Sequence, residues 1–302
     1  MSKILTKKQQ FSYFLYLTTL KTIALLPLGI LYSFSGAVAV VVRKILKYRL
    51  KTVRKNLKNA FPQYNEQELL RIERQFYRHL TDIMVETIKL FHISDKQLRK
   101  RVKVTGFELI NTATDNGQST VMYLAHFGNW EWVQEMSNYF SDKAISGSIF
   151  HILKSPVWDN IFYKMRSRWN LLLLPQPEVV KTLLQYHHNR IPWVMGFIAD
   201  QRPGHGDFKH WTTFMHQDTP YVNGPEVIGK RIGAQFVYLD VAMPRKGYYE
   251  FNLRPLKPLD DGEPYPVSRA YLKELEETIR KQPHLYLWSH NRWSLKRQQV
   301  HG

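Results

Sequence analysis

Cysteine is absent from the 302-residue chain. Without it the protein has no disulfide, no thiolate metal site and no cysteine nucleophile. Acidic residues are also scarce: 25 Asp and Glu stand against 43 Lys and Arg, which gives a formal net charge of +18 at pH 7. This excess of positive charge points to an anionic partner such as a lipid surface, a nucleic acid or an acidic carrier protein. Charge alone does not choose among these partners.

Internal repeats, low-complexity segments and long linkers rich in Pro, Gly or Ser are lacking too. A chain of this length buries one substantial core. Its hydrophobic fraction of 44%, with 14% aromatic residues, is too high for a disordered protein. The polar remainder excludes a protein built mainly of membrane spans. We therefore expect one globular domain with an appended helical segment.

Residues 22–42 form a long uncharged stretch, flanked by Lys21 and Arg43. A bilayer crossing needs about 20 such residues. Pro27 and Gly29 weaken a spanning helix and suit one that lies in the membrane interface. The stretch is longer than the apolar region of a usual signal peptide, and no small-residue cleavage site follows it. Residues 1–42 are therefore predicted to be a membrane anchor, with a full span and an interfacial helix both open.

Basic residues crowd the segment that follows this stretch. The positive-inside rule then places the rest of the chain in the cytoplasm. Such a block also attracts anionic lipid at the membrane surface, although a solvated helix face has the same composition. Residues 43–100 are predicted to form a basic amphipathic helical segment. Its membrane-surface candidates are Arg43, Lys44, Lys47, Arg49, Lys51, Arg54, Lys55 and Lys58.

Asn65 and Glu68 have the spacing of a capping box, which predicts the start of a helix. Apolar residues then recur at helical spacing as far as Phe91, so one long amphipathic helix is expected. Core packing and contact with a membrane surface both explain this pattern.

The hydrophobic pattern of the sequence changes from about residue 102, where short apolar runs alternate with helix-like segments. This alternation predicts an α/β fold with a mostly parallel sheet flanked by helices, and Gly247 is expected to turn a late antiparallel pair. The domain covers residues 101–302. Strands are expected at residues 120–125, 144–150, 171–174, 193–199 and 236–243, and helices at residues 130–140, 155–169, 178–188, 224–232 and 268–281.

His126 directly follows the first of these strands, and Glu131 comes five residues later. Gly128 permits a tight turn between them, and Asn129 is suited to cap the next helix. Residues five apart lie ~140° apart around a helix, so a strand, turn and helix are needed to bring the two together. His126 is then the predicted general base and Glu131 the carboxylate that orients it. The spacing is common by itself, but the carboxyl end of a strand is where ligands bind in such sheets.

The run from His126 to Glu131 matches the H-x4-D/E signature of the lysophospholipid acyltransferase superfamily, and the chain resembles its late lipid A acyltransferases. Four further blocks carry this resemblance nearly from end to end. They are Arg54-Lys55-Asn56-Leu57 with Ala60-Phe61-Pro62, the arginine block 164–168, Ala199-Asp200-Gln201, and the C-terminal segment 287–293 with the sequence LWSHNRW.

The resemblance implies an acyl transfer. Such enzymes take an acyl chain from acyl carrier protein, or from acyl coenzyme A, and place it on the hydroxyl of a 3-hydroxyacyl chain on a lipid A precursor. It further implies a single N-terminal anchor in a bacterial inner membrane and a catalytic domain on the cytoplasmic side. No metal, no dissociable cofactor and no nucleic acid partner are implied.

Further site residues follow from the matched blocks. Arg166, or Arg168, is expected to bind an acceptor phosphate or to stabilise the oxyanion. Asp200 and Gln201 follow a strand, where they either position the acceptor and support Arg166 or simply cap a turn. Asn129 is the remaining candidate for binding substrate or the oxyanion.

Other interpretations remain open at this level. The first is an acyltransferase of the same superfamily that acts on a lysophospholipid, a glycolipid or an amino lipid. The second is a basic nucleic-acid-binding protein, although known binding motifs are missing. The third is a structural membrane tether in which His126 and Glu131 only pack.

Overall fold

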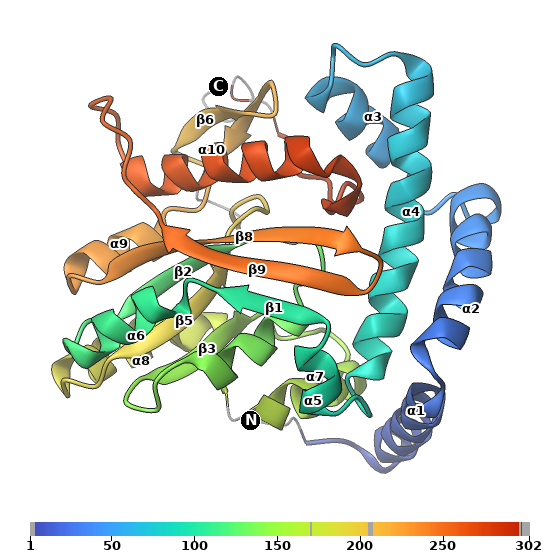
Figure 1. The fold of residues 1–302 in the computed structure, drawn as a ribbon, viewed down its shortest axis with the longest axis horizontal. Coiled ribbons are helices and arrows are strands. Elements are labelled where there is room, and N and C mark those ends of the chain that lie inside the picture. Colours follow the sequence, from blue (N-terminus) through green and yellow to red (C-terminus); the bar gives the residue numbers. More distant parts are fainter. Residues whose placement is uncertain (1–3, 170, 205–207, 296, 298–302) are drawn as a thin grey trace.

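A mostly parallel sheet forms the centre of the computed structural model, which describes residues 4–169, 171–204, 208–295 and 297 (Figure 1). Within these residues the sheet has seven strands in the order β1-β9-β8-β2-β5-β3-β4. The pair β8–β9 is antiparallel and its neighbours pair in parallel, so the predicted fold class is confirmed. The strands are β1 Val102–Thr105, β2 Thr120–Leu124, β3 Ile145–Phe150, β4 Leu172–Pro175, β5 Trp193–Ile198, β8 Gln235–Arg245 and β9 Tyr248–Pro255.

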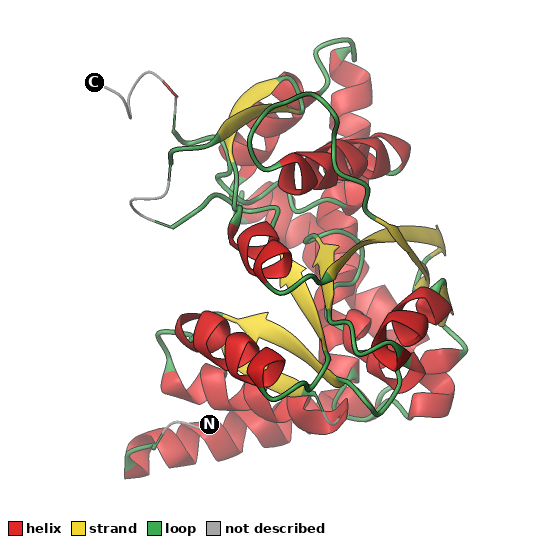
Figure 2. Ribbon diagram, turned by 90° about the vertical axis from the view of Figure 1, so that its left-hand side faces the viewer, coloured by secondary structure: helices red, strands yellow, loops and turns green. Residues whose placement is uncertain are grey.

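Helices cover both sides of this sheet (Figure 2). α10 packs on β8, whereas α6 packs on β9 and β2. A separate hairpin joins β6 (Trp211–Phe214) to β7 (Gln217–Pro220). The helices of the body are α5 Asp95–Arg99, α6 Phe107–Asp115, η2 Trp132–Tyr139, α7 Pro156–Arg166, η3 Ser167–Trp169, η4 Gln176–Glu178, α8 Val179–His188, α9 Gly224–Arg231, α10 Pro266–Lys281 and η5 Pro283–Leu285.

The expected long amphipathic helix is α4, Glu66–Lys89. Its capping box forms in both directions: the Glu68 amide donates to the Asn65 side chain at 3.0 Å, and the Asn65 amide donates to Glu68 at 2.8 Å. Ile72 and Phe76 are buried. α4 stands between the sheet and α2 (Figure 1), so both of its sides are used in packing. α3 (Leu50–Ala60) precedes it.

The predicted anchor is divided into two helices, α1 (Lys7–Leu25) and α2 (Leu28–Val40). The break falls at Pro27, which has no amide hydrogen to continue α1. Two carbonyls at this break accept hydrogen bonds from the Lys89 ammonium, that of Ala24 at 2.7 Å and that of Leu26 at 2.9 Å. A π-helical turn, η1 (Val41–Ile45), extends α2. In the described part of the chain, the helix that is long and apolar enough to cross a membrane therefore starts at Leu28, not at residue 22, and ends at Ile45.

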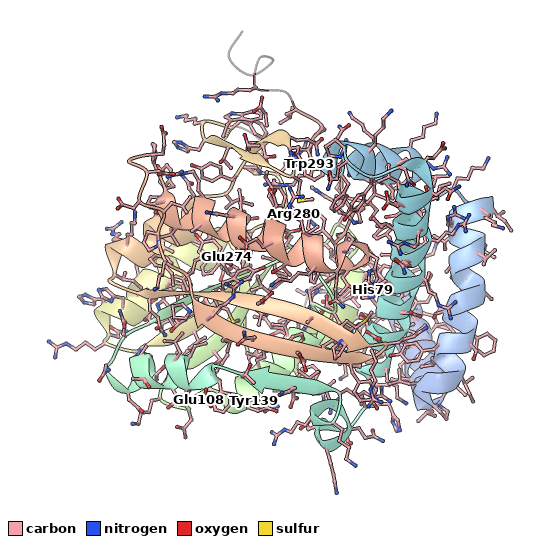
Figure 3. All side chains as sticks on the ribbon, turned by 45° about the horizontal axis from the view of Figure 1, so that its top comes forward. His79, Glu108, Tyr139, Glu274, Arg280 and Trp293 are labelled. Atoms are coloured by element: carbon pink, nitrogen blue, oxygen red, sulfur yellow. The ribbon has the colours of Figure 1, made fainter. Side chains whose placement is uncertain are left out.

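The C-terminal segment returns to the N-terminal half of the chain. The Asn56 side chain donates to the carbonyls of Trp288 at 2.9 Å and His290 at 3.0 Å. Trp293, labelled in Figure 3, donates from its indole to Thr219 of β7 at 2.8 Å. Sequence blocks more than 200 residues apart thus meet in one core.

Candidate active site

His126 and Asp200 lie together at the carboxyl edge of the sheet. β2 and β5 are parallel neighbours with Leu124 opposite Ile198, so the residue two positions beyond each strand end lies next to the other. His126 Nδ1 is 2.9 Å from Asp200 Oδ1, and the His126 amide donates to the same oxygen at 3.2 Å. The parallel register thus brings together two of the predicted site residues.

The His126–Asp200 contact fixes the useful tautomer of the imidazole. A carboxylate accepts the Nδ1 hydrogen, which leaves the lone pair on Nε2. The Gln201 side-chain amide lies beside the ring, 3.2 Å from Nδ1 and 3.4 Å from Nε2. The His126 side chain is 21% exposed, so the imidazole is partly open to solvent.

Asp200 is almost fully buried but remains ionised. Burial by itself raises the pKa of this carboxyl, yet the charge and hydrogen bonds of His126 and the charge of Arg292 hold the pKa below its ordinary value. Arg292 is 1% exposed, and its guanidinium nitrogens have no hydrogen-bond partner among the described residues. The sequence offered Arg292 only as part of a C-terminal motif, and the structure places it in the core.

Glu131 pairs with Arg166. The guanidinium donates twice, from Nη2 to Oε1 at 2.6 Å and from Nε to Oε2 at 3.1 Å. The Gln134 side chain donates to the same carboxylate at 3.2 Å. Sequence reasoning expected Glu131 to lie against His126, but its bonds turn towards α7, and the carboxylate on His126 is that of Asp200.

Arg168 belongs elsewhere. Its guanidinium donates to the Leu90 carbonyl at 3.0 Å and to Asp95 at 2.6 Å, and it stacks on Trp169. Of the two arginines left open by the sequence, Arg166 therefore pairs with Glu131, and Arg168 joins η3 to the end of α4. Among the described residues, no cluster of His, Asp or Glu is arranged to hold a metal ion.

The turn after His126 depends on Gly128 and Asn129. Gly128 has a φ of +61°, and a Cβ at this position would lie 2.8 Å from a methyl carbon of Val241. The Asn129 side-chain oxygen accepts from the amides of Glu131 at 3.1 Å and Trp132 at 3.0 Å, so it fixes the turn that leads into the next helix. That helix is the 3-10 helix η2, and its N-cap is Glu131 and not Asn129, so Glu131 precedes the helix instead of lying in its first turn.

Glu86 on α4 binds the side chain of Asn129 in this turn, and sequence reasoning missed this residue. Its fully buried carboxylate accepts hydrogen bonds from Asn129 Nδ2 at 2.6 Å, Tyr249 at 2.8 Å and Tyr32 at 2.6 Å. Burial raises its pKa to about 7, against the effect of these donors. Glu86 thus joins α2, α4, β9 and the catalytic turn.

Replacing Glu86 by Gln is expected to flatten the pH dependence of stability. The pKa of Glu86 is raised on folding, so the native state binds the extra proton and wild-type stability falls as the pH rises from about 4.5 to about 7. The loss across this window is on the order of a few kcal/mol. Glu86→Gln has no ionisable group at this position, so thermal unfolding at pH 5 and pH 8 should give a smaller difference in Tm than in the wild type.

The control is Glu277→Gln, a change at an exposed position of α10. This control should show the same difference in Tm between pH 5 and pH 8 as the wild type. If Glu86→Gln also showed the wild-type difference in Tm, Glu86 would not be the group that titrates in this range.

The C-terminal segment forms backbone hydrogen bonds with the catalytic turn. The Gly128 amide donates to the Leu285 carbonyl at 3.1 Å, and the Leu287 amide donates to the His126 carbonyl at 3.1 Å. Phe127 forms a bridge with Tyr286. This pairing holds the backbone of His126 in place, in addition to the contact of Glu86 with Asn129.

A basic hollow of about 640 Å³ lies at the end of α2. Arg43 and Arg54 both bind the buried Glu73 at 2.7 Å, so the charges of these two candidates are partly balanced within the protein. Lys55 and Lys58 are exposed outside the hollow on α3. The remaining basic candidates line the hollow, namely Lys44, Lys47, Arg49 and Lys51.

Comparison with known proteins identifies the family. A family model described as bacterial lipid A biosynthesis acyltransferase matches residues 1–295. The chain belongs to this family. It is 23% identical over 274 residues to the lipid A biosynthesis palmitoleoyltransferase of Escherichia coli (strain K12), covering 90% of this chain and 87% of the relative. The lauroyltransferase of the same strain is 22% identical over 279 residues, with 90% and 87% covered.

A lipid A biosynthesis acyltransferase of Haemophilus influenzae is 20% identical over 288 residues, covering 93% of this chain and 87% of the relative. Membership of the bacterial lipid A biosynthesis acyltransferases makes the protein an acyltransferase enzyme of lipid A biosynthesis. The family resemblance read from the sequence blocks is thereby confirmed.

Proposed function

We propose that the protein transfers an acyl chain from acyl carrier protein, or from acyl coenzyme A, to the hydroxyl of a 3-hydroxyacyl chain on a lipid A precursor. The observation that carries this proposal is the contact of His126 Nδ1 with the buried, ionised Asp200, because it leaves Nε2 as a base at the partly open edge of the sheet. Family membership supplies the acyl transfer in lipid A biosynthesis.

The chemistry needs one base and no acyl-enzyme. His126 Nε2 takes the proton of the acceptor hydroxyl while the oxygen attacks the thioester carbonyl. The tetrahedral intermediate then collapses, the C–S bond breaks, and the proton on Nε2 passes to the departing thiolate. Asp200 stabilises the imidazolium formed between these steps, so the absence of cysteine does not hinder the reaction.

Arg166 is proposed to bind a negative charge of the substrates, either the acceptor phosphate or the developing oxyanion. A planar guanidinium suits both groups. Its bidentate bond with Glu131 fixes its direction, and 24% of its side chain stays exposed. In this mechanism Glu131 positions Arg166, and the orienting role that sequence reasoning gave to Glu131 is taken by Asp200.

The proposed partners are anionic, in keeping with the net charge of +18. Acyl carrier protein as donor, a lipid A precursor as acceptor and the bacterial inner membrane as surface all carry negative charge. The basic hollow beside α2 is proposed to face anionic lipid headgroups. The catalytic domain then lies on the cytoplasmic side.

The function is tested by incubating the purified full-length protein with labelled acyl-carrier-protein or acyl-coenzyme-A donors and an under-acylated lipid A precursor. Mass spectrometry should show one added ester-linked acyl chain. A matched acceptor whose acyl chains lack the 3-hydroxyl should gain none. Transfer to a lysophospholipid, with none to the lipid A precursor, would overturn the proposal.

A further inference from the structure

α2 has two different faces at helical spacing. One stripe is buried in the protein, and the other is exposed and apolar. Together with η1 the helix is about 27 Å long, close to the thickness of a bilayer core. The buried stripe is Leu28, Leu31, Ser35 and Ala39, and the exposed stripe is Ile30, Phe34, Val38, Val41 and Ile45.

The buried stripe faces a polar surface of α4. Ser35 donates to Asp82 through its hydroxyl, and its carbonyl accepts from Thr81 at 3.0 Å. One turn earlier, Tyr32 donates to Glu86 at 2.6 Å. Asp82 also pairs with Lys246 of the β8–β9 turn at 2.7 Å. The inner face of α2 is therefore fixed to ionisable groups of the catalytic body.

These contacts conflict with a crossing of the bilayer. Charged side chains at bilayer depth carry a high free-energy cost, and backbone groups there need partners within the membrane protein. α4 cannot accompany α2 into the bilayer, because Glu86 is bonded to Asn129 in the catalytic turn. If α2 left alone, Asp82 and Glu86 would lose their partners on it.

α1 and the catalytic body continue the exposed apolar surface. Phe11 and Phe14 of α1 are about 70% exposed. Tyr16 of α1 stacks on Trp158 of α7 at 5.6 Å between ring centroids. Trp158 itself and the nearby Ile152 are large exposed apolar residues of the body. Both helices lie at the same edge of the molecule, outside α4, and α1 packs on α7 (Figure 1).

We propose that α1 and α2 lie along one leaflet of an anionic bilayer and do not cross it, with Trp158 and Ile152 of the body immersed beside them. The bilayer is the occupant because the surface pairs exposed apolar stripes with the cations at the end of α2, the pattern of an interfacial helix. The inference rests on the membrane attachment proposed above and goes beyond it by assigning α1 and the catalytic body to the same side of the membrane.

A small crevice of the body lies beside the proposed membrane surface. Phe150, Leu153 and Arg166 are among the residues that line it. Leu153 is exposed next to Ile152, on the proposed membrane surface. In this arrangement Arg166 therefore lies close to the lipid-facing side of the protein.

The absence of cysteine makes the test direct. Single cysteines replace Lys8 at the start of α1, or Lys257 after β9 as a reference for the body; both positions are exposed. Spheroplasts of a Gram-negative host are treated with a membrane-impermeant maleimide before and after lysis. We expect both cysteines to be protected in intact spheroplasts and both to react after lysis.

A crossing helix gives a different result, in which the cysteine at position 8 reacts in intact spheroplasts and the cysteine at position 257 does not. That outcome overturns the inference. Recovery of the protein in the soluble fraction overturns it as well. Acyl transfer is measured on the same membranes, so a crossing α2 in an active enzyme separates failure of this inference from failure of the proposed function.

A paired-cysteine experiment tests the contact between α2 and α4 in the membrane. Ser35→Cys with Asp82→Cys is expected to cross-link under mild oxidation in native membranes. The matched control, Phe34→Cys with Asp82→Cys, places the first cysteine on the exposed stripe and should not cross-link. Equal cross-linking of the two pairs, or of neither, would contradict the proposed arrangement.

Discussion

Replacing His126 by alanine is expected to lower kcat for acyl transfer by roughly 10²- to 10⁴-fold while KM changes little. The side chain takes the hydroxyl proton in the transition state, so its loss removes an interaction that the bound substrates do not yet use. Steady-state kinetics with a labelled donor and a lipid A precursor measures both parameters. The variant should fold, because its neighbours in the turn are held through backbone bonds with Leu285 and Leu287.

His187→Ala is the matched control for this change, since His187 is an exposed histidine at the end of α8. Its kinetics should equal those of the wild type. More than a tenth of the wild-type kcat in His126→Ala would show that another group removes the proton.

Replacing Asp200 by asparagine is expected to lower kcat by a similar factor, roughly 10²- to 10⁴-fold. Asparagine keeps the shape but can turn its amide towards His126 Nδ1 and donate a hydrogen bond. The ring proton then moves to Nε2, where the lone pair is needed. The measurement is the same assay, with circular dichroism to confirm that the variant is folded.

Stability should show a matching acid-side effect. The pKa of Asp200 is lower in the folded state than its ordinary value, so its pairing stabilises the protein above that ordinary value, and the stabilisation is lost as the pH falls through the lowered pKa. The wild type should therefore lose its advantage in Tm over Asp200→Asn when the pH is lowered from 6 towards 3.

Glu131→Gln distinguishes the two carboxylates. Its carboxyl group is bonded to Arg166, so the change should weaken substrate binding or oxyanion stabilisation and leave the pH dependence of the His126 step as in the wild type. In the pH–rate profile, the range in which kcat rises with pH reports the deprotonation of the base. If this range shifted in Glu131→Gln and not in Asp200→Asn, Glu131 would be the residue that orients the base.

Most of the sheet could be predicted from the sequence because its strands are short and apolar. β2 is buried at all five positions, so its apolar run has no polar interruption, and the capping box at Asn65 marked α4 correctly. β1, α6 and the β6–β7 hairpin were not predicted. β1 alternates buried and exposed residues over only four positions, too few to show a period.

The sequence predicts His126 as a site residue, but it does not predict which carboxylate contacts His126. Glu131 and Asp200 are both acids near the right strand ends, and which of them meets the imidazole depends on side-chain direction after a 3-10 start that the spacing does not show. Glu86 reads as an ordinary acid on an amphipathic helix. Its burial arises only when α2, β9 and the turn at Asn129 pack around α4.

The pairing of the catalytic turn with the end of the chain has a consequence during synthesis. The backbone groups of His126 and Gly128 find their partners in Leu287 and Leu285, more than 150 residues later. The turn is therefore incomplete until the chain has been synthesised as far as Leu287. The N-terminal helices are made long before that point and are available to bind a bilayer. The chain is therefore expected to reach the membrane before its catalytic turn has formed.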